Sequence, residues 1–318
     1  MKDQQTLTIK TSGLTKRYGQ AVVVNGLDLH VKAGQCYGLL GPNGAGKSTT
    51  IHMLTTMTSP TAGEAWIVNQ SILADPVAIR RSVGLVFQDS ALDRTMTVDE
   101  NLQFAAALYG MSKKQANERI EELLAVFNLG SRRNTKLLAL SGGQRRAVDI
   151  ARGVLHQPQV LFLDEPTIGL DPIQIIEIRK LIQELAASHT IILSSHILPE
   201  ITQICQRVII INEGEIAAVD SLEGLTASLR KSERLSLTVR NGNNAIEEKL
   251  AALEQVLSVL PGEKNQFLLE CELNSNLQDE IARLALENQW GLVEIKPLSL
   301  TLEDIFLKLT IEEKDVKA

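Results

Sequence analysis

Residues 41–48 read Gly41-Pro42-Asn43-Gly44-Ala45-Gly46-Lys47-Ser48, which matches the pattern G-x-x-x-x-G-K-[ST]. An apolar run at residues 36–40 precedes the motif, and a helix is predicted to begin near Ser48, as the motif requires. The glycines let backbone N–H groups point at a phosphate without side-chain clashes, and the helix N-terminus adds its dipole. The stretch therefore predicts a strand, a phosphate-binding loop and a helix. The alternative, a glycine-rich turn with a chance lysine, leaves the flanking strand and helix unexplained.

Two side chains at the end of this loop carry its chemistry. Lys47 would bring a mobile positive charge to the β- and γ-phosphates of a nucleotide, and Ser48 would offer a hydroxyl ligand to Mg²⁺. We therefore predict that the loop binds a nucleoside triphosphate with Mg²⁺. Taken alone, the loop indicates only a nucleoside triphosphate, so kinases, GTPases and helicases remain open.

Short apolar runs recur on both sides of the loop, and each is bounded by polar or turn residues. They lie at residues 36–40, 83–87, 160–163 and 190–193. Such runs predict buried strands of a mostly parallel sheet with helices on both faces, which is an α/β fold. The alternating runs at residues 7–10, 27–31 and 64–68 predict an antiparallel sheet beside it, so that the complete sheet system is mixed.

The apolar run Leu161-Phe162-Leu163 ends in two acids, Asp164 and Glu165. A buried strand with acids at its tip places their carboxylates at the edge of the sheet where α/β proteins bind ligands. We expect Asp164 to hold Mg²⁺, directly or through water, and Glu165 to orient and polarise the attacking water. A solvated strand end is the alternative when the acids are considered without the phosphate-binding loop.

A second glycine-containing motif, Leu140-Ser141-Gly142-Gly143-Gln144, follows a predominantly helical stretch. Ser141 is predicted to cap a helix that runs to about His156, and the two glycines expose its first N–H groups. The motif therefore predicts a second anion-binding helix end in the same chain. An ordinary Ser-Gly-Gly turn is the alternative.

A helical insert is predicted at about residues 89–156, and it contains the second glycine motif. Thr97 with Glu100 forms a predicted capping box for a helix to about Tyr109, and Ser112 with Gln115 forms another for a helix that ends at Gly130.

After about Leu225 the phosphate-type motifs stop. Strands are predicted at residues 234–240, 256–260, 266–272 and 292–296, with helices at 244–253, 277–288 and 302–309. The order β-α-β-β-α-β predicts a small α+β domain of ferredoxin-like type, and a loosely ordered tail is the alternative. The predicted domains are residues 1–225 and 226–318.

These stretches together resemble the nucleotide-binding subunit of ABC transporters. The loop at 41–48 resembles the family's Walker A motif, residues 160–165 its Walker B strand, and residues 140–144 its signature sequence. Further positions follow in the family's order at Tyr18, Gln88, Asp171 and His196. The resemblance covers about the first 220 residues. Gln206 departs from it, outside the phosphate site, at a position where the family often has aspartate.

The resemblance implies roles for these residues. Tyr18 would stack on adenine, and Gln88 would lie between Mg²⁺ and a transmembrane partner. Asp171, in the loop 169–171, would link two ATP sites, and His196 would contact the γ-phosphate. Taken singly, each also fits a structural role, such as a helix cap for Asp171. The implied catalytic residues are Lys47, Gln88, Glu165 and His196. The implied Mg²⁺ ligands are Ser48, Gln88 and Asp164. The implied contacts with ATP are Tyr18, Gly41, Pro42, Asn43, Gly44, Ala45, Gly46, Lys47, Ser48, Thr49, Ser141, Gly142, Gly143, Gln144 and Asp171.

The resemblance also implies partners. In this family two copies form a head-to-tail dimer, in which the signature sequence of one faces the phosphate loop of the other. The helical insert and Gln88 form a groove for a coupling helix of a membrane permease. The C-terminal stretch, including residues 297–306, resembles that of daunorubicin-resistance-like subunits of the drug-exporter type. An importer ATPase with a regulatory C-terminal domain and a soluble, non-transport ABC ATPase are the alternatives.

Composition narrows the classes further. The 318 residues carry a formal net charge of −6, which disfavours a general nucleic-acid binder, so we expect no nucleic-acid partner. The three cysteines, Cys36, Cys205 and Cys271, show no C-x-x-C pair, so we expect buried or free thiols. No signal peptide and no apolar run of about 18 residues is found. We therefore expect a soluble, cytoplasmic chain that reaches the inner face of the cell membrane through its permease.

Overall fold

A computed structural model describes residues 7–229, 232–241, 245–262, 265–272, 275–298, 302–306 and 309. The chain divides into two compact units, one formed by Met1–Leu222 with Phe306–Ala318 and the other by Glu223–Ile305. Each unit is described by itself below. Among the described residues no helix is both long enough and apolar enough to cross a bilayer.

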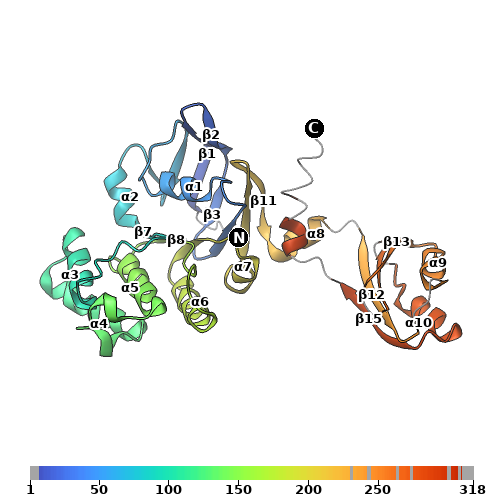
Figure 1. The fold of residues 1–318 in the computed structure, drawn as a ribbon. Helices are drawn as coiled ribbons and strands as arrows, with labels where there is room; N and C mark the ends of the chain where they lie inside the picture. Colours follow the sequence, from blue (N-terminus) through green and yellow to red (C-terminus); the bar gives the residue numbers. More distant parts are fainter. Residues whose placement is uncertain are drawn as a thin grey trace, which may run out of the picture. The chain divides into compact units, whose positions relative to one another are not determined.

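The first unit is built around a six-stranded sheet (Figure 1). Its strand order is β11-β10-β4-β9-β8-β7, and all neighbours are parallel except β11 with β10. The strands are β4 (Cys36–Leu40), β7 (Val83–Val86), β8 (Val160–Asp164), β9 (Thr190–Ser194), β10 (Arg207–Asn212) and β11 (Glu215–Ser221). Every residue of β4, β8 and β9 is buried, which explains their continuous apolar runs. The predicted α/β fold is confirmed.

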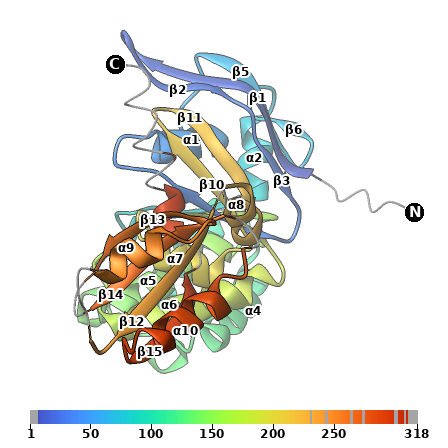
Figure 2. The ribbon, with the colours of Figure 1, turned by 90° about the vertical axis from the view of Figure 1, so that its right-hand side faces the viewer.

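An antiparallel sheet lies beside the parallel one and is seen at the top of Figure 2. Its strands are β1 (Leu7–Tyr18), β2 (Ala21–Leu27), β3 (His30–Lys32), β5 (Ala62–Ile67) and β6 (Gln70–Ser71). Buried residues of both sheets, such as Ile9, Val31, Phe162 and Ile209, form one apolar cluster. The predicted mixed sheet system is therefore confirmed.

The described part of this unit contains helices α1 (Lys47–Leu54), α2 (Pro76–Ser82), α3 (Val98–Leu108), α4 (Lys113–Val126), α5 (Gly142–Val154), α6 (Pro172–Ala186) and α7 (Leu198–Ile204). Of these, α1, α3, α4 and α5 are the helices that the sequence motifs predicted. Both predicted capping boxes, at Thr97 and Ser112, are present.

The predicted end of α4 is wrong. The helix ends at Val126, because Asn128 adopts a left-handed conformation (φ 54°) and the N–H group of Leu129 turns back to the carbonyl of Leu124. An asparagine therefore terminates the helix before Gly130 is reached.

The second unit contains a four-stranded antiparallel sheet in the order β13-β14-β12-β15. Two helices cover one face and bury Leu237, Leu269, Ile246 and Ile281 against it (Figure 1). The elements are α8 (Leu222–Leu229), β12 (Glu233–Val239), α9 (Ala245–Ala251), β13 (Val256–Pro261), β14 (Gln266–Cys271), α10 (Gln278–Glu287) and β15 (Leu292–Leu298). Residues 302–306 and 309 are helical, and residues 307 and 308 of the predicted last helix lie outside the described residues.

All three cysteines are free and buried, as expected. Cys36 and Cys205 lie with their Sγ atoms 3.5 Å apart, and burial raises the pKa of the Cys205 thiol.

Candidate functional site

The predicted phosphate-binding loop connects β4 to α1, and two of its glycines are dictated by the backbone. Gly46 stands at the N-terminus of α1 with φ 101°, a left-handed conformation that favours glycine. A Cβ atom at Gly41 would lie 2.4 Å from the carbonyl oxygen of Ile211, on β10. Pro42 and Asn43 are exposed at the tip of the loop, whereas Thr49 is half-buried on α1.

Lys47 folds back onto this loop. Its Nζ donates to the carbonyl oxygens of Gly41 at 2.8 Å and Pro42 at 3.1 Å. Burial lowers the pKa of Lys47, and the nearby carboxylates of Glu165 and Asp164 counteract part of that effect. The ammonium group is therefore held at the mouth of the loop beside two acids.

The two acids at the end of β8 take different partners. Asp164 accepts from Ser194 Oγ at 2.5 Å and from Ser48 Oγ at 3.4 Å. The backbone N–H of Glu165 donates to Ser194 Oγ at 3.0 Å, while its side chain reaches His196, with 2.9 Å between Oε2 and Nδ1. Glu165 has φ 47°, an unusual conformation for a residue with a side chain, of the kind found at functional sites. The ends of β4, β8 and β9 thus bring the predicted loop, acids and histidine together.

The signature stretch begins α5 in the predicted manner. Ser141 Oγ accepts from the N–H of Gln144 at 3.2 Å, and Gln144 Oε1 accepts from the N–H of Ser141 at 3.1 Å. The N–H of Gly143 is not free, because it donates to Gln174 Oε1 at 2.9 Å. Within the described residues no hydrogen bond joins residues 141–144 to residues 41–48.

Three predicted residues lie apart from this cluster of side-chain contacts. Tyr18, at the end of β1, exposes 52% of its surface, and the ammonium of Lys16 lies 5.0 Å from its ring centre. Gln88 is exposed, just beyond β7. Asp171 caps α6 and accepts from the N–H groups of Ile173 and Gln174, which is the structural role open to it in the sequence.

Arg146 is a residue of the site that the sequence analysis missed. It is 7% exposed and donates to the carbonyl oxygens of Phe87 at 2.7 Å, Gln88 at 3.2 Å and Glu165 at 3.0 Å. One guanidinium therefore joins the signature helix to the chain around Gln88 and to the end of β8. A possible sequence signal was its position two residues after the signature.

A buried acid extends this connection. Asp149 has no exposed surface and lies 3.8 Å from Arg146 and 3.2 Å from Arg152. Burial raises the pKa of Asp149 and lowers that of Arg146, and the opposite charges oppose both shifts. No role was predicted for Ser194 or Gln174, because their partners Asp164 and Gly143 lie 30 and 31 residues away in the sequence.

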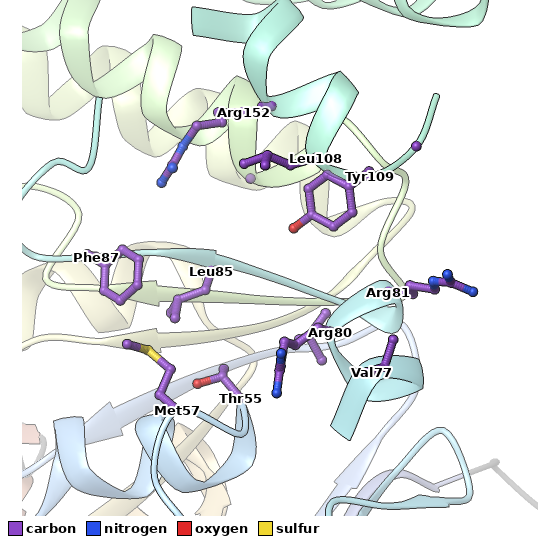
Figure 3. A pocket seen from close by; sticks show the side chains of 14 residues that line it. Thr55, Met57, Val77, Arg80, Arg81, Leu85, Phe87, Leu108, Tyr109 and Arg152 are labelled. Carbon is purple, nitrogen blue, oxygen red and sulfur yellow. The ribbon is translucent and has the colours of Figure 1, made fainter. Parts of the chain in front are cut away.

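A groove of about 540 Å³ lies on the same unit (Figure 3). Leu85 and Phe87 lie at the base of the groove. Leu108 and Tyr109 stand on one side of it, and Met57 and Thr55 stand on the other. The lining residues are Thr55, Met57, Val77, Arg80, Arg81, Val83, Leu85, Phe87, Ala105, Leu108, Tyr109, Gly110, Arg152 and Gly153. The groove is thus mainly apolar and carries three arginines.

Comparison with known proteins places this geometry in context. Residues 24–168 match the family described as ABC transporter. A daunorubicin/doxorubicin resistance ATP-binding protein of Streptomyces peucetius is 35% identical, with 98% of this chain and 94% of that protein covered. A bacitracin transport ATP-binding protein of Bacillus licheniformis is 36% identical, with 95% and 96% covered. A Nod factor export ATP-binding protein I of Cupriavidus metallidurans is 36% identical, with 97% and 99% covered.

Solved structures match a shorter part of the chain. The dimeric ATP-binding cassette MJ0796, in a post-hydrolysis state with ADP and Pi, has a TM-score of 0.61 and 28% identity, covering 67% of this chain and 98% of that one. CbiO1 of Clostridium perfringens, part of an ABC transporter complex, has a TM-score of 0.65 and 28% identity, covering 70% and 91%.

Proposed function

Because this chain belongs to the ABC transporter family, as an ATP-binding and ATP-hydrolysing subunit of the drug-exporter type, we propose that it powers export through a separately encoded membrane permease. One observation supports export as the direction of transport. The relative named for resistance matches along 94% of its length and the relative named for export along 99%, C-terminal unit included. The cassette structures cover only 67% to 70% of the chain.

We infer that the loop at residues 41–48 holds the phosphates of ATP. Lys47 exchanges its carbonyl partners for the β- and γ-phosphates, and Tyr18 stacks its exposed ring on adenine. Ser48 and Asp164 approach within 3.4 Å and offer hydroxyl and carboxylate oxygens, which are ligands that Mg²⁺ prefers. Gln88 adds an amide oxygen. Bound Mg²⁺ would neutralise charge that develops on the phosphates.

Glu165 is the residue that we assign to the attacking water. Its carboxylate orients and polarises the water, and His196, at 2.9 Å, holds that carboxylate in place. Lys47 stabilises negative charge on the phosphates from one side only. The negative charge that develops on the γ-phosphate during hydrolysis needs hydrogen-bond donors on more than one side.

A second copy of the chain supplies the other donors. Ser141 and the glycine N–H groups of one copy face the nucleotide on the other copy in a head-to-tail dimer, with Asp171 between the two sites. Because one chain carries both half-sites, a homodimer is the simplest assembly. The cassette MJ0796 is dimeric in its post-hydrolysis state with ADP and Pi, which supports a dimer.

The groove of Figure 3 is where we place the permease. Its apolar base suits the apolar face of an amphipathic helix. Arg80 and Arg81 are among the lining residues and suit a carboxylate on that helix, whereas Arg152 is paired with Asp149. Through such a permease the chain would lie on the inner face of the membrane.

The C-terminal unit is proposed to be a ferredoxin-like accessory domain. Its element order and its strand order, β13-β14-β12-β15 with antiparallel neighbours, support that assignment. The proposed domains remain residues 1–225, with the helical subdomain at about 89–156, and 226–318.

Purification of the tagged chain from solubilised membranes tests the proposal. We expect one polytopic membrane protein to co-purify in stoichiometric amount and to stimulate ATP hydrolysis after reconstitution. Recovery of ribosomes or nucleic acid in its place would contradict the transport function. A co-purifying periplasmic-type substrate receptor would contradict export.

A further inference from the structure

Gln174, in the first turn of α6, reaches across to the first turn of the signature helix. Its Oε1 accepts from the N–H of Gly143 at 2.9 Å. The backbone N–H of Gln174 donates to Asp171 Oδ1 at 2.9 Å. One residue therefore connects the signature helix to the loop that precedes α6.

The two signature glycines leave room for this side chain. A Cβ atom at Gly143 would lie 2.9 Å from Gln174 Cγ and 3.1 Å from its Cβ. A Cβ atom at Gly142 would lie 3.2 Å from Gln174 Oε1. The close approach of Gln174 therefore favours glycine at position 143 above all, in addition to any approach by a nucleotide.

The contact also uses one of the groups on which anion binding at this helix end depends. The first N–H groups of a helix have no partner within the helix and are the groups that bind an anion. The N–H of Gln144 is used by the Ser141 cap and the N–H of Gly143 by Gln174. An incoming phosphate must therefore displace Gln174 to reach Gly143.

We propose that Gln174 is a positioning residue that competes with the γ-phosphate of the partner copy for the Gly143 N–H group. Gln174 holds α5 against α6 in the open form and releases the N–H when the ATP-bound dimer closes. Because the backbone of Gln174 belongs to the α6 cap formed by Asp171, release of the Gly143 N–H loosens the link between the signature helix and the loop before α6. The inference rests on the proposed head-to-tail dimer.

Two substitutions distinguish competition between Gln174 and the γ-phosphate from a purely structural role of Gln174. Gln174→Met keeps the volume and removes the acceptor, so we expect the KM for ATP to fall roughly 2- to 10-fold, as for loss of one neutral hydrogen bond, with kcat unchanged within about 2-fold. Gln174→Glu gives a stronger acceptor and a charge that repels the γ-phosphate, so we expect KM to rise by about 10-fold or more.

The matched control is Gln183→Met on the same helix, where the side chain is exposed and donates to the carbonyl of Gln203 at 2.8 Å. This control is expected to leave KM unchanged. A purely structural role of Gln174 predicts that Met and Glu both raise KM and lower kcat, and this result, or an unchanged KM in both variants, would overturn the inference.

ATP-driven dimerisation of full-length chains with Glu165→Gln, followed by light scattering, separates this inference from its premise. We expect Gln174→Met to lower the ATP concentration at half-dimerisation by the same factor as KM. Equal midpoints would overturn the role of Gln174 alone. Failure to dimerise with either residue at position 174 would overturn the proposed dimer as well.

Discussion

His196 Nδ1 lies 2.9 Å from Glu165 Oε2, and the backbone N–H of Glu165 is held by Ser194. The carboxylate is thus fixed from the side chain and from the main chain, as is needed for a group that must orient one water molecule. A substitution that removes the proton acceptor at Glu165 should therefore affect hydrolysis and leave ATP binding intact.

Glu165→Gln keeps the shape of the side chain and removes its ability to accept a proton. We expect ATP to bind, steady turnover to fall by about 100-fold or more, and the dimer to accumulate in the ATP-bound form. Phosphate release and size-exclusion chromatography measure the two effects. Glu118→Gln, on the exposed side of α4, is the control. Phosphate release near the wild-type rate would refute the assigned role.

Lys47→Ala acts earlier, on binding. The ammonium that now donates to two loop carbonyls would be lost, so we expect nucleotide affinity to fall roughly 10- to 100-fold, the range for a charged hydrogen-bonding group. Titration with a fluorescent ATP analogue measures the affinity directly. An unchanged dissociation constant combined with slow turnover would instead place Lys47 in the chemical step alone.

Arg146→Met removes hydrogen bonds to three carbonyls and leaves Asp149 with one cationic partner fewer. Breaking a buried charge pair typically costs about 3–5 kcal/mol, so we expect a loss of this order in the free energy of unfolding and a lower kcat. Urea unfolding and ATPase assays measure the two. Adding Asp149→Asn should restore part of the stability, because it removes the under-compensated charge. Strictly additive losses would show that the two residues act independently.

Because of His156, we expect the free energy of unfolding to depend on pH. Its ring stacks on Tyr109 at 3.8 Å, and burial lowers its pKa from 6.5. The unfolded chain therefore binds a proton at His156 more readily than the folded chain does. The contribution of His156 to the free energy of unfolding is complete above about pH 6.5 and is lost as the pH falls through the folded-state pKa. The slope is at most about 1.4 kcal/mol per pH unit for this proton.

Thermal unfolding between pH 7.5 and pH 5 measures that slope. We expect His156→Gln to make the pH dependence shallower, while His30→Gln, at an exposed position on β3, leaves it as in the wild type. An identical slope for His156→Gln would show that other groups, such as His189, whose pKa burial also lowers, dominate.

Leu108→Glu tests the groove. Leu108 is 73% exposed and lines the wall formed by α3, so a charge there opposes the docking of an apolar helix face. We expect the permease to be lost from the co-purification. Leu286→Glu, at a residue that is 71% exposed on α10, is matched in exposure and should retain the permease. Retention by Leu108→Glu would move the docking surface elsewhere.

The parts of the site that could be predicted are those encoded by consecutive residues. The loop at residues 41–48 and the Ser141 cap depend on local glycine conformations and on hydrogen bonds across three residues. Arg146 and Gln174 act on groups 19 to 59 residues away, so only the folded chain shows their partners. The end of α4 was mispredicted for a related reason, since asparagine and glycine both permit a left-handed turn and the sequence does not say which one the packing uses.

Phe87 gives its carbonyl oxygen to Arg146 and its ring to the groove. Main-chain carbonyls are common to all amino acids, so a substitution at this position changes the surface offered to a partner while the attachment to the ATP site is kept. Support and recognition are therefore carried by different atoms of one residue. The same ATPase subunit could therefore be adapted to a different permease by a substitution at this position, while the residues that bind and hydrolyse ATP stay unchanged.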